Sequence, residues 1–190
     1  MDSSVAHATE LPADIQAFVG RLTAVEDRGD LARLRRAAGR PLSQAGQALG
    51  LFYRLVPSGV SRDEEIYFLV ATLYPLNPPT RGHETKGDFG TTMAALRKKV
   101  DLGALDRRMA ILLDSDFDRI DGKPGGGSLS YRLRHLIKYA EAQAVGVDWG
   151  RLLADLVRWT DPERRVQKRW ARSYYQGTRS NGRGGDSNVG

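Results

Sequence analysis

The sequence predicts an all-α protein with about eight or nine helices, arranged in one bundle or in two small helical subdomains. Three observations support this fold class. Apolar residues recur every three or four positions through most of the 190 residues, which is the period of an amphipathic helix. No segment alternates apolar and polar residues as a half-buried strand does. Clusters rich in Gly and Pro separate the apolar segments and indicate turns between helices.

The chain divides into a central domain and two short ends. Residues 1–10 are small and polar, and residues 177–190 are rich in Gly, Ser and Asn, so we expect both ends to be disordered. Residues 11–176 form the helical domain. Its expected helices, taken from the spacing of the apolar residues, cover residues 11–27, 31–38, 48–56, 62–74, 89–100, 104–114, 129–144, a segment that begins after Asp148, and 161–175.

Short polar residues set the expected helix starts. The N-cap candidates, each placed before an apolar segment, are Asp30, Ser61, Asp148 and Asp161. Ser61 and Glu64 have the spacing of a capping box, and the helix after them is apolar nearly all round, which predicts a central buried helix. Between helices, residues 75–88 form a Pro/Gly-rich loop and residues 123–128 (KPGGGS) a flexible connector.

The last predicted helix, residues 161–175, has two contrasting faces. At about 100° per residue, Val166, Trp170 and Tyr174 fall together on one side. Basic residues fall on the opposite side, namely Arg165, Lys168, Arg169 and Arg172. The pattern predicts that one face packs in the core while the other carries positive charge to the surface.

Positive charge is concentrated near this helix. Residues 128–175 contain ten Lys/Arg and five Asp/Glu, a net charge of +5, whereas the whole chain has +6. Such a concentration favours a polyanionic partner, and the aromatic residues behind the basic face favour nucleic acid over a membrane surface. An amphipathic helix that is merely solvated and binds nothing is the alternative.

Motifs for catalysis or metal binding are mostly missing. The chain has no Cys, which excludes disulfides and thiolate metal sites and fits a cytoplasmic location. The acidic run Asp114–Asp121 starts like an EF-hand loop, but Arg119 replaces its glycine and Gly125 its final glutamate. We therefore expect no catalytic residues, no metal and no cofactor. No apolar segment approaches the length of a membrane span.

Several motifs resemble the CasB family, the small subunits of the type I-E CRISPR effector complex Cascade. The resemblance covers about residues 11–176. It rests on segments whose order and spacing match the family, namely Leu34-Arg35-Arg36 after Gly29-Asp30, Phe52–Val56, Tyr131–Ile137, Val147–Trp149, Leu156–Trp159 and Glu163–Trp170.

The resemblance implies a non-catalytic, helical subunit that acts as a dimer in an RNA-guided surveillance complex. Its partners would be the repeated backbone subunit, the large subunit, the guide RNA complex, and the target and displaced non-target DNA strands. Its arginines would hold DNA backbones and stabilise the R-loop, because strand exchange is nearly balanced in free energy. The implied contacts are Arg36, Arg62, Arg107, Arg108, Arg132, Arg134, Arg164 and Arg165, to which the helical wheel adds Lys168, Arg169 and Arg172.

Two other functions stay open at this point. The basic surface could dock on acidic neighbouring subunits, which would make the protein a structural spacer without direct DNA contact. Alternatively, Asp114, Asp116, Asp118 and Asp121 could hold a metal ion in a nuclease, although no other feature of the sequence supports this. The leading hypothesis is DNA-backbone binding by arginines from separate helices that converge into one trough.

Overall fold

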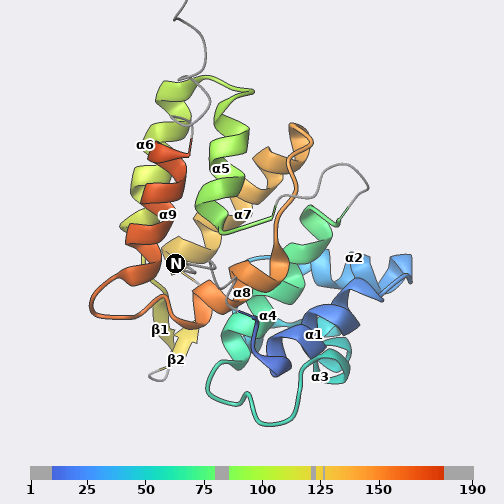
Figure 1. Cartoon of the computed structure of the whole chain (residues 1–190). Helices are drawn as coiled ribbons and strands as arrows, with labels where there is room; N and C mark the ends of the chain where they lie inside the picture. Colours follow the sequence, from blue (N-terminus) through green and yellow to red (C-terminus); the bar gives the residue numbers. More distant parts are fainter. Residues whose placement is uncertain (1–9, 80–85, 121–122, 126, 178–190) are drawn as a thin grey trace, which may run out of the picture.

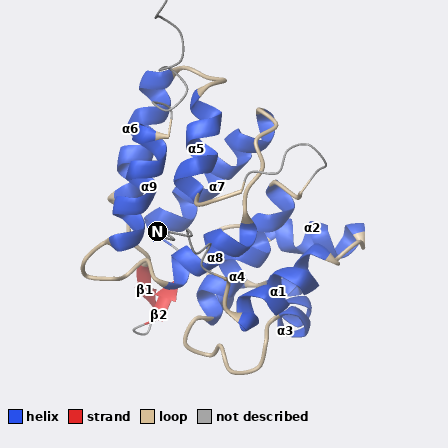
Figure 2. Ribbon diagram, viewed as in Figure 1, coloured by secondary structure: helices blue, strands red, loops and turns tan. Residues whose placement is uncertain are grey.

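The computed structural model describes residues 10–79, 86–120, 123–125 and 127–177. It confirms the all-α fold class, because nine α-helices make up most of these residues (Figures 1 and 2). The disorder predicted for both ends of the chain falls almost entirely outside the described residues. Among the described helices, none is both long enough and apolar enough to cross a membrane.

The helices follow the predicted segments, with ends that shift by a few residues. The α-helices are α1 Ala13–Thr23, α2 Arg28–Arg36, α3 Leu49–Leu55, α4 Glu64–Leu73, α5 Phe89–Arg97, α6 Leu102–Leu113, α7 Gly127–Ala142, α8 Trp149–Val157 and α9 Arg165–Gln176. Three short 3₁₀ segments, η1 Leu42–Gln44, η2 Gly46–Ala48 and η3 Tyr74–Leu76, connect them.

One small hairpin departs from the prediction that the chain has no strands. Strand β1 (Asp118–Ile120) pairs antiparallel with β2 (Lys123–Gly125) between α6 and α7. Three-residue strands are too short to show an alternating pattern, so periodicity could not reveal them. The predicted connector is correspondingly shorter, because β2 occupies its start and α7 already begins at Gly127.

Helix α4 lies at the centre of one group of helices, as its apolar sequence predicted. Every residue from Ile66 to Leu73 is buried, and α4 packs against α2, α7 and α8. Aromatic rings from neighbouring helices contact it edge to face, Phe18 of α1 against Tyr67 at 4.9 Å and Phe52 of α3 against Phe68 at 5.3 Å. Helices α2 and α7 both pack against α4 and against η3, which positions the basic residues described below.

A second group, α5, α6, α7 and α9, stands side by side at the other end of the molecule (Figure 1). Helices α5 and α9 pack tightly, because Gly90 leaves room for the α9 backbone. A Cβ atom at Gly90 would lie only 2.2 Å from the carbonyl oxygen of Trp170. The buried apolar residues of both groups belong to one continuous core.

Helix starts were predicted with mixed success. Asp148 caps α8 by accepting a 2.9 Å hydrogen bond from the Arg151 N–H, as predicted. For α2 the cap is Asp27, not Asp30, because the side chain of Asp27 reaches the Asp30 N–H at 2.7 Å. The proposed capping box is wrong, since a turn occupies residues 60–63 and α4 begins only at Glu64.

Helix α9 begins four residues later than predicted. The Asp161 side chain accepts a hydrogen bond from the Glu163 N–H at 2.9 Å, which closes a turn instead of starting a helix. Arg164 then takes a left-handed conformation with φ of 54°, and the helix starts at Arg165. The carboxylate of Asp161 also forms an ion pair with Arg165, the first residue of α9.

Candidate nucleic-acid interface

Helix α9 has the predicted buried side, but two of the four basic residues on its other side, Arg165 and Arg169, are paired with acids. Val166, Trp170 and Tyr174 are buried, which confirms the apolar side. On the other side, Arg165 forms ion pairs of 2.9 Å with both Asp161 and Glu163. These local pairs neutralise much of the field that Arg165 would offer to a phosphate.

Arg169 belongs to a buried network. It donates a hydrogen bond to Asp155, which is 3% exposed, and lies 3.5 Å from Asp88. The indole N–H of Trp170 donates to the second oxygen of Asp155 at 2.6 Å. Burial raises the pKa of Asp155 above its usual value, while hydrogen bonds from Trp170 and Arg169 act in the opposite direction. Arg169 therefore stabilises the junction of α8 and α9.

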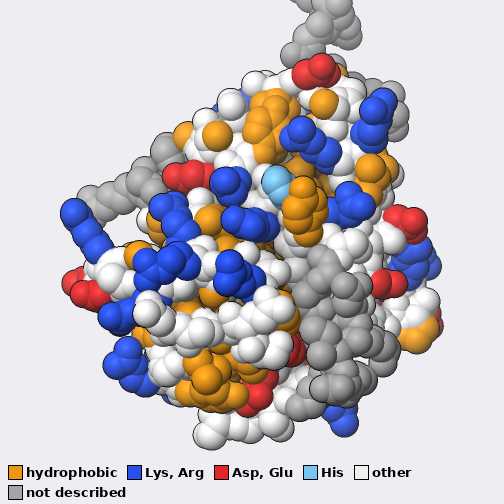
Figure 3. All heavy atoms as spheres, turned by 180° about the vertical axis from the view of Figure 1, so that it is seen from behind, with side chains coloured by type: hydrophobic (Ala, Val, Ile, Leu, Met, Phe, Trp, Pro, Cys, Tyr) orange, Lys and Arg blue, Asp and Glu red, His pale blue; other side chains and the backbone are white. Residues whose placement is uncertain are grey.

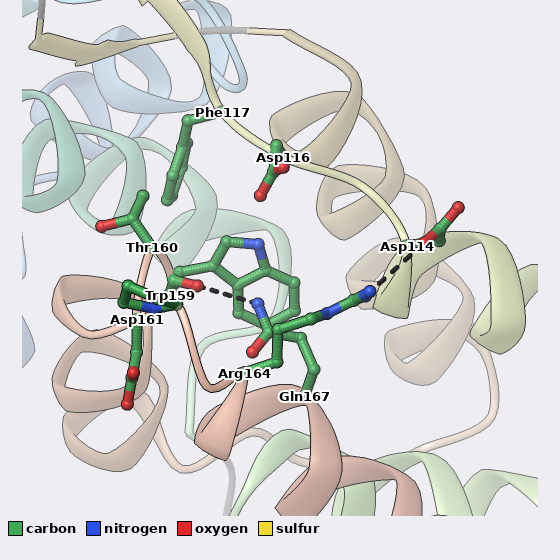
Figure 4. Close-up of a pocket in the computed structure, with 9 residues that line it drawn as sticks. Asp114, Asp116, Phe117, Trp159, Thr160, Asp161, Arg164 and Gln167 are labelled. Carbon is green, nitrogen blue, oxygen red and sulfur yellow. Dashed lines mark hydrogen bonds and ion pairs between the residues drawn. The ribbon is translucent and has the colours of Figure 1, made fainter.

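Arg164 closes one side of an acidic hollow at the end of α6 (Figure 4). Its guanidinium group donates to the Leu113 carbonyl at 2.6 Å and pairs with Asp114 at 3.5 Å. The hollow has a volume of about 330 Å³, and Asp114, Asp116 and Asp161 all line it. Gln167 lies at its base and donates to the Trp159 carbonyl at 2.8 Å.

This acidic hollow does not assemble a metal site within the described residues. No group of three or more potential ligands lies close enough together there to hold a metal ion. The side chains of Asp118 and Asp121, which the nuclease alternative also needs, lie outside the part of the chain whose side chains are described.

A different surface, between α2 and α7, brings exposed basic residues together. A hollow of about 420 Å³ is lined by Arg35 from α2 and by Arg134, Lys138 and Glu141 from α7. Gly39, in the turn just after α2, lies against α7. Its φ is +78°, and a Cβ atom there would lie 3.5 Å from Cδ of Arg134.

Two further hollows are lined by basic residues of the same helices and of α6. On the α2 side, one is lined by Arg33, Arg36 and Arg40. On the α6 side, another is lined by Arg108, Ile111, Tyr131, Arg132, His135 and Leu136. We call the residues of these three hollows the basic face. Figure 3 shows Lys and Arg side chains gathered across this side of the molecule, around a histidine.

The electrostatics of the basic face differ from those of α9. Eight Lys/Arg side chains line its three hollows, against the single acid Glu141. Arg33 pairs with the carboxylate of Asp30. The other seven form no ion pair with any acid that the structure describes, and they are Arg35, Arg36, Arg40, Arg108, Arg132, Arg134 and Lys138. Their charges are therefore available to an outside anion.

The structure thus divides the residues predicted from the sequence. Arg36, Arg108, Arg132 and Arg134 come together on the basic face. Arg164, Arg165 and Arg169 lie at α9 with acids of their own. The rest are exposed but line none of the three hollows, and they are Arg62, Arg107, Lys168 and Arg172.

Four basic residues of the face were not among the predicted contacts, namely Arg33, Arg35, Arg40 and Lys138. Lys138 could have been found from sequence, because it follows Arg134 by four residues and such pairs share a helix face. Arg33 and Arg40 likewise lie three and four residues from Arg36, which was predicted, and they line the same hollow. Arg35 had no such signal, because its place in a hollow depends on the tertiary contact with α7.

Fold and surface together define an all-helical protein with a basic face of the kind that suits a sugar–phosphate backbone. Residues 30–175 match the family model of the CRISPR-associated protein Cse2, and the chain belongs to this family. The Cse2 protein of Thermus thermophilus is 35% identical over 148 residues, which cover 76% of this chain and 77% of that protein. The resemblance to the CasB family drawn from the sequence is thereby confirmed.

Solved structures share the fold. A crystal structure of a Cse2-family protein from Thermus thermophilus has a TM-score of 0.69 at 26% identity, covering 88% of this chain and 99% of that one. A crystal structure of CasB from the same organism has a TM-score of 0.64 at 30% identity, covering 85% and 96%. A chain of a CRISPR RNA-guided surveillance complex has a TM-score of 0.68 at 23% identity, covering 87% and 96%.

Proposed function

We propose that this protein is the non-catalytic small subunit of a type I-E CRISPR surveillance complex, Cascade, and that it stabilises the R-loop by binding DNA backbones. Membership of the Cse2 family supports the assignment, as does the shared fold with a chain of an RNA-guided surveillance complex. In this role it would contact the backbone and large subunits of the complex and pair with a second copy of itself.

The observation that carries the DNA-binding part is the basic face across α2, α7 and α6. Its guanidinium groups can form charge-assisted, bidentate bonds with phosphates. Backbone contacts of this type carry no sequence information, which suits a subunit that must accept any target. Because an RNA–DNA heteroduplex is about as stable as the duplex it replaces, a few such contacts can decide whether the R-loop persists.

A salt-dependence measurement tests this proposal. We would compare the full-length protein with the double variant Arg134→Gln/Lys138→Gln and with Arg158→Gln, an exposed arginine after α8 that lines none of the three hollows. Each lost phosphate contact should reduce the slope of log K against log salt by about 0.9 for duplex DNA and about 0.7 for a single strand. The control should keep the slope of the unchanged protein.

The complete complex provides the second measurement. With guide RNA and partner subunits present, the double variant should assemble normally but lose R-loops faster than the control. Unchanged R-loop lifetime would contradict the proposal. If the double variant instead fails to co-purify with the other subunits, the basic face is a docking surface for acidic proteins and the protein is a structural spacer.

A further inference from the structure

The hollow between α6 and α7 combines features that the rest of the basic face does not. Its volume is about 280 Å³, just below the roughly 300–1,000 Å³ of ordinary small-molecule pockets. Ile111 and Leu136 provide apolar surface, and Arg108 and Arg132 provide positive charge. No acid lines it, in contrast to the acidic hollow at the end of α6. This combination suits a planar apolar group that carries a negative charge beside it.

An exposed aromatic residue stands at this hollow. Tyr131 is 60% exposed, the largest value among the exposed large apolar side chains of the described residues. Its ring lies 4.3 Å from the His135 ring, tilted by 56°. That contact holds the phenol ring against α7 while most of its surface remains in solvent. An aromatic ring held in this way is prepared to stack against another planar ring.

The two arginines of the hollow, Arg108 and Arg132, can bind a negatively charged group next to a ring stacked on Tyr131. The Arg108 guanidinium lies over the Tyr139 ring at 5.4 Å, which restricts its movement. Arg132 lies half-buried in the wall of the hollow. Its guanidinium group is a donor from which phosphate and base oxygens can accept hydrogen bonds.

We propose that this hollow receives one unpaired nucleobase of a DNA strand, stacked on Tyr131, with the adjoining phosphates bound by Arg108 and Arg132. The proposal rests on the proposed function and adds a preference for single-stranded DNA. In a duplex the faces of each base are covered by its neighbours, so only an unpaired base can offer a face to Tyr131. The hollow would therefore hold the displaced strand in preference to a duplex.

The test uses the full-length protein and an oligodeoxythymidine of about 12 nucleotides, compared with an abasic strand and a duplex of equal length. Tyr131→Leu should weaken binding of the thymidine strand roughly 5- to 150-fold, which corresponds to one lost base stack. Tyr131→Phe should keep the affinity, because it keeps the ring. Affinity for the duplex and for the abasic strand should not change.

Tyr53→Leu is the matched control, because Tyr53 is 51% exposed but lies on α3 and lines none of the three hollows. It should behave like the unchanged protein. A 2-aminopurine base in the strand should lose fluorescence on binding to the unchanged protein but not to Tyr131→Leu. Equal losses on strand and duplex, or no loss on the strand, would overturn the base-stacking proposal.

The outcome also separates this proposal from the proposed function. If Tyr131→Leu has no effect while Arg134→Gln/Lys138→Gln still reduces the salt slope, backbone binding stands and only base stacking is refuted. If the unchanged protein binds no DNA even at about 50 mM salt, both are refuted together.

Discussion

Trp170 donates a hydrogen bond of 2.6 Å from its indole N–H to Asp155, a carboxylate with only 3% of its surface exposed. This bond joins α9 to α8 inside the core. The ring of Trp170 also packs against Trp159 at 4.9 Å and against Phe89 of α5 at 5.2 Å. Asp155 therefore orients α9, and the position of every basic residue on that helix depends on it.

Removing the acceptor at this position should weaken the fold, whereas neutralising it should cost little. Asp155→Asn can still accept a hydrogen bond from Trp170, and burial favours a neutral group at this place. Asp155→Ala leaves Trp170, Arg169 and Arg151 without their acceptor, which costs roughly 1–3 kcal/mol. Urea unfolding at neutral pH should show a lower free energy of unfolding for Asp155→Ala, with an unchanged m-value, and a value close to that of the unchanged protein for Asp155→Asn.

The same variant should change how stability depends on pH. Burial raises the folded pKa of Asp155 above its ordinary value of 3.8, so the folded state binds this proton more tightly than the unfolded state. The contribution of the carboxyl to stability is then greatest below pH 3.8 and declines as pH rises through the folded pKa. The unchanged protein should therefore lose stability relative to Asp155→Asn, whose amide does not titrate, as pH rises from below 3.8 to neutral. A gain of stability relative to Asp155→Asn over the same range would mean that the arginine partners outweigh burial.

Gly90 should tolerate no side chain, because the α9 backbone occupies the space. The Cβ atom of an alanine would lie 2.2 Å from the Trp170 carbonyl oxygen, so α5 and α9 would have to move apart. Overpacking of this kind costs about 1–3 kcal/mol or more, and thermal unfolding should occur at a lower temperature. Gly20→Ala in α1 is the control, since nothing lies within 4 Å of its Cβ position. It should be neutral or stabilising by up to about 1 kcal/mol.

The sequence predicted those features that depend on one helix alone. The spacing of Val166, Trp170 and Tyr174 specifies a buried stripe whatever the helix packs against, and all three are buried. The start of the same helix could not be predicted, because Asp161 has the properties of a helix cap and of a turn residue alike. Its side chain bonds in the turn at Glu163.

The arrangement of the candidate site was less accessible to sequence reasoning. Arg35 and Arg134 are far apart in the chain, and they share a hollow because α2 and α7 both pack against α4 and η3. A helical wheel places a basic residue on the outside of its helix but does not reveal an acid that reaches it from another segment. The sequence therefore predicted both Arg169 and Lys168 as DNA contacts, although Asp155 and Asp88 both contact Arg169 in the structure.

The phenol of Tyr67 should make the fold sensitive to alkaline pH. Its hydroxyl donates to Asp14 at 2.7 Å and joins α4 to α1. Burial, followed by the bond to Asp14, raises its pKa well above the ordinary 10.0, so stability falls as pH rises past 10.0. Tyr67→Phe should lose about 1 kcal/mol at neutral pH and show a shallower decline in alkaline solution. An equally steep decline in both proteins would place its origin elsewhere.

Arg165 and Arg134 should differ in their contribution to DNA binding, although sequence reasoning treats them alike. Arg165 must leave Asp161 and Glu163, each at 2.9 Å, before it can pair with a phosphate, and its departure exposes two negative charges to the DNA. Arg134 forms no ion pair with a described acid. We therefore expect Arg134→Gln to reduce the slope of log K against log salt by about 0.9 on duplex DNA, the value for one phosphate contact. Arg165→Gln should reduce this slope much less. Filter binding at several salt concentrations measures both slopes.

Combining Arg165→Gln with Glu163→Gln provides the control, because the two changes leave the net charge of the chain unaltered. Equal slope losses from Arg165→Gln and Arg134→Gln would show that DNA displaces the local acids and that α9 belongs to the interface.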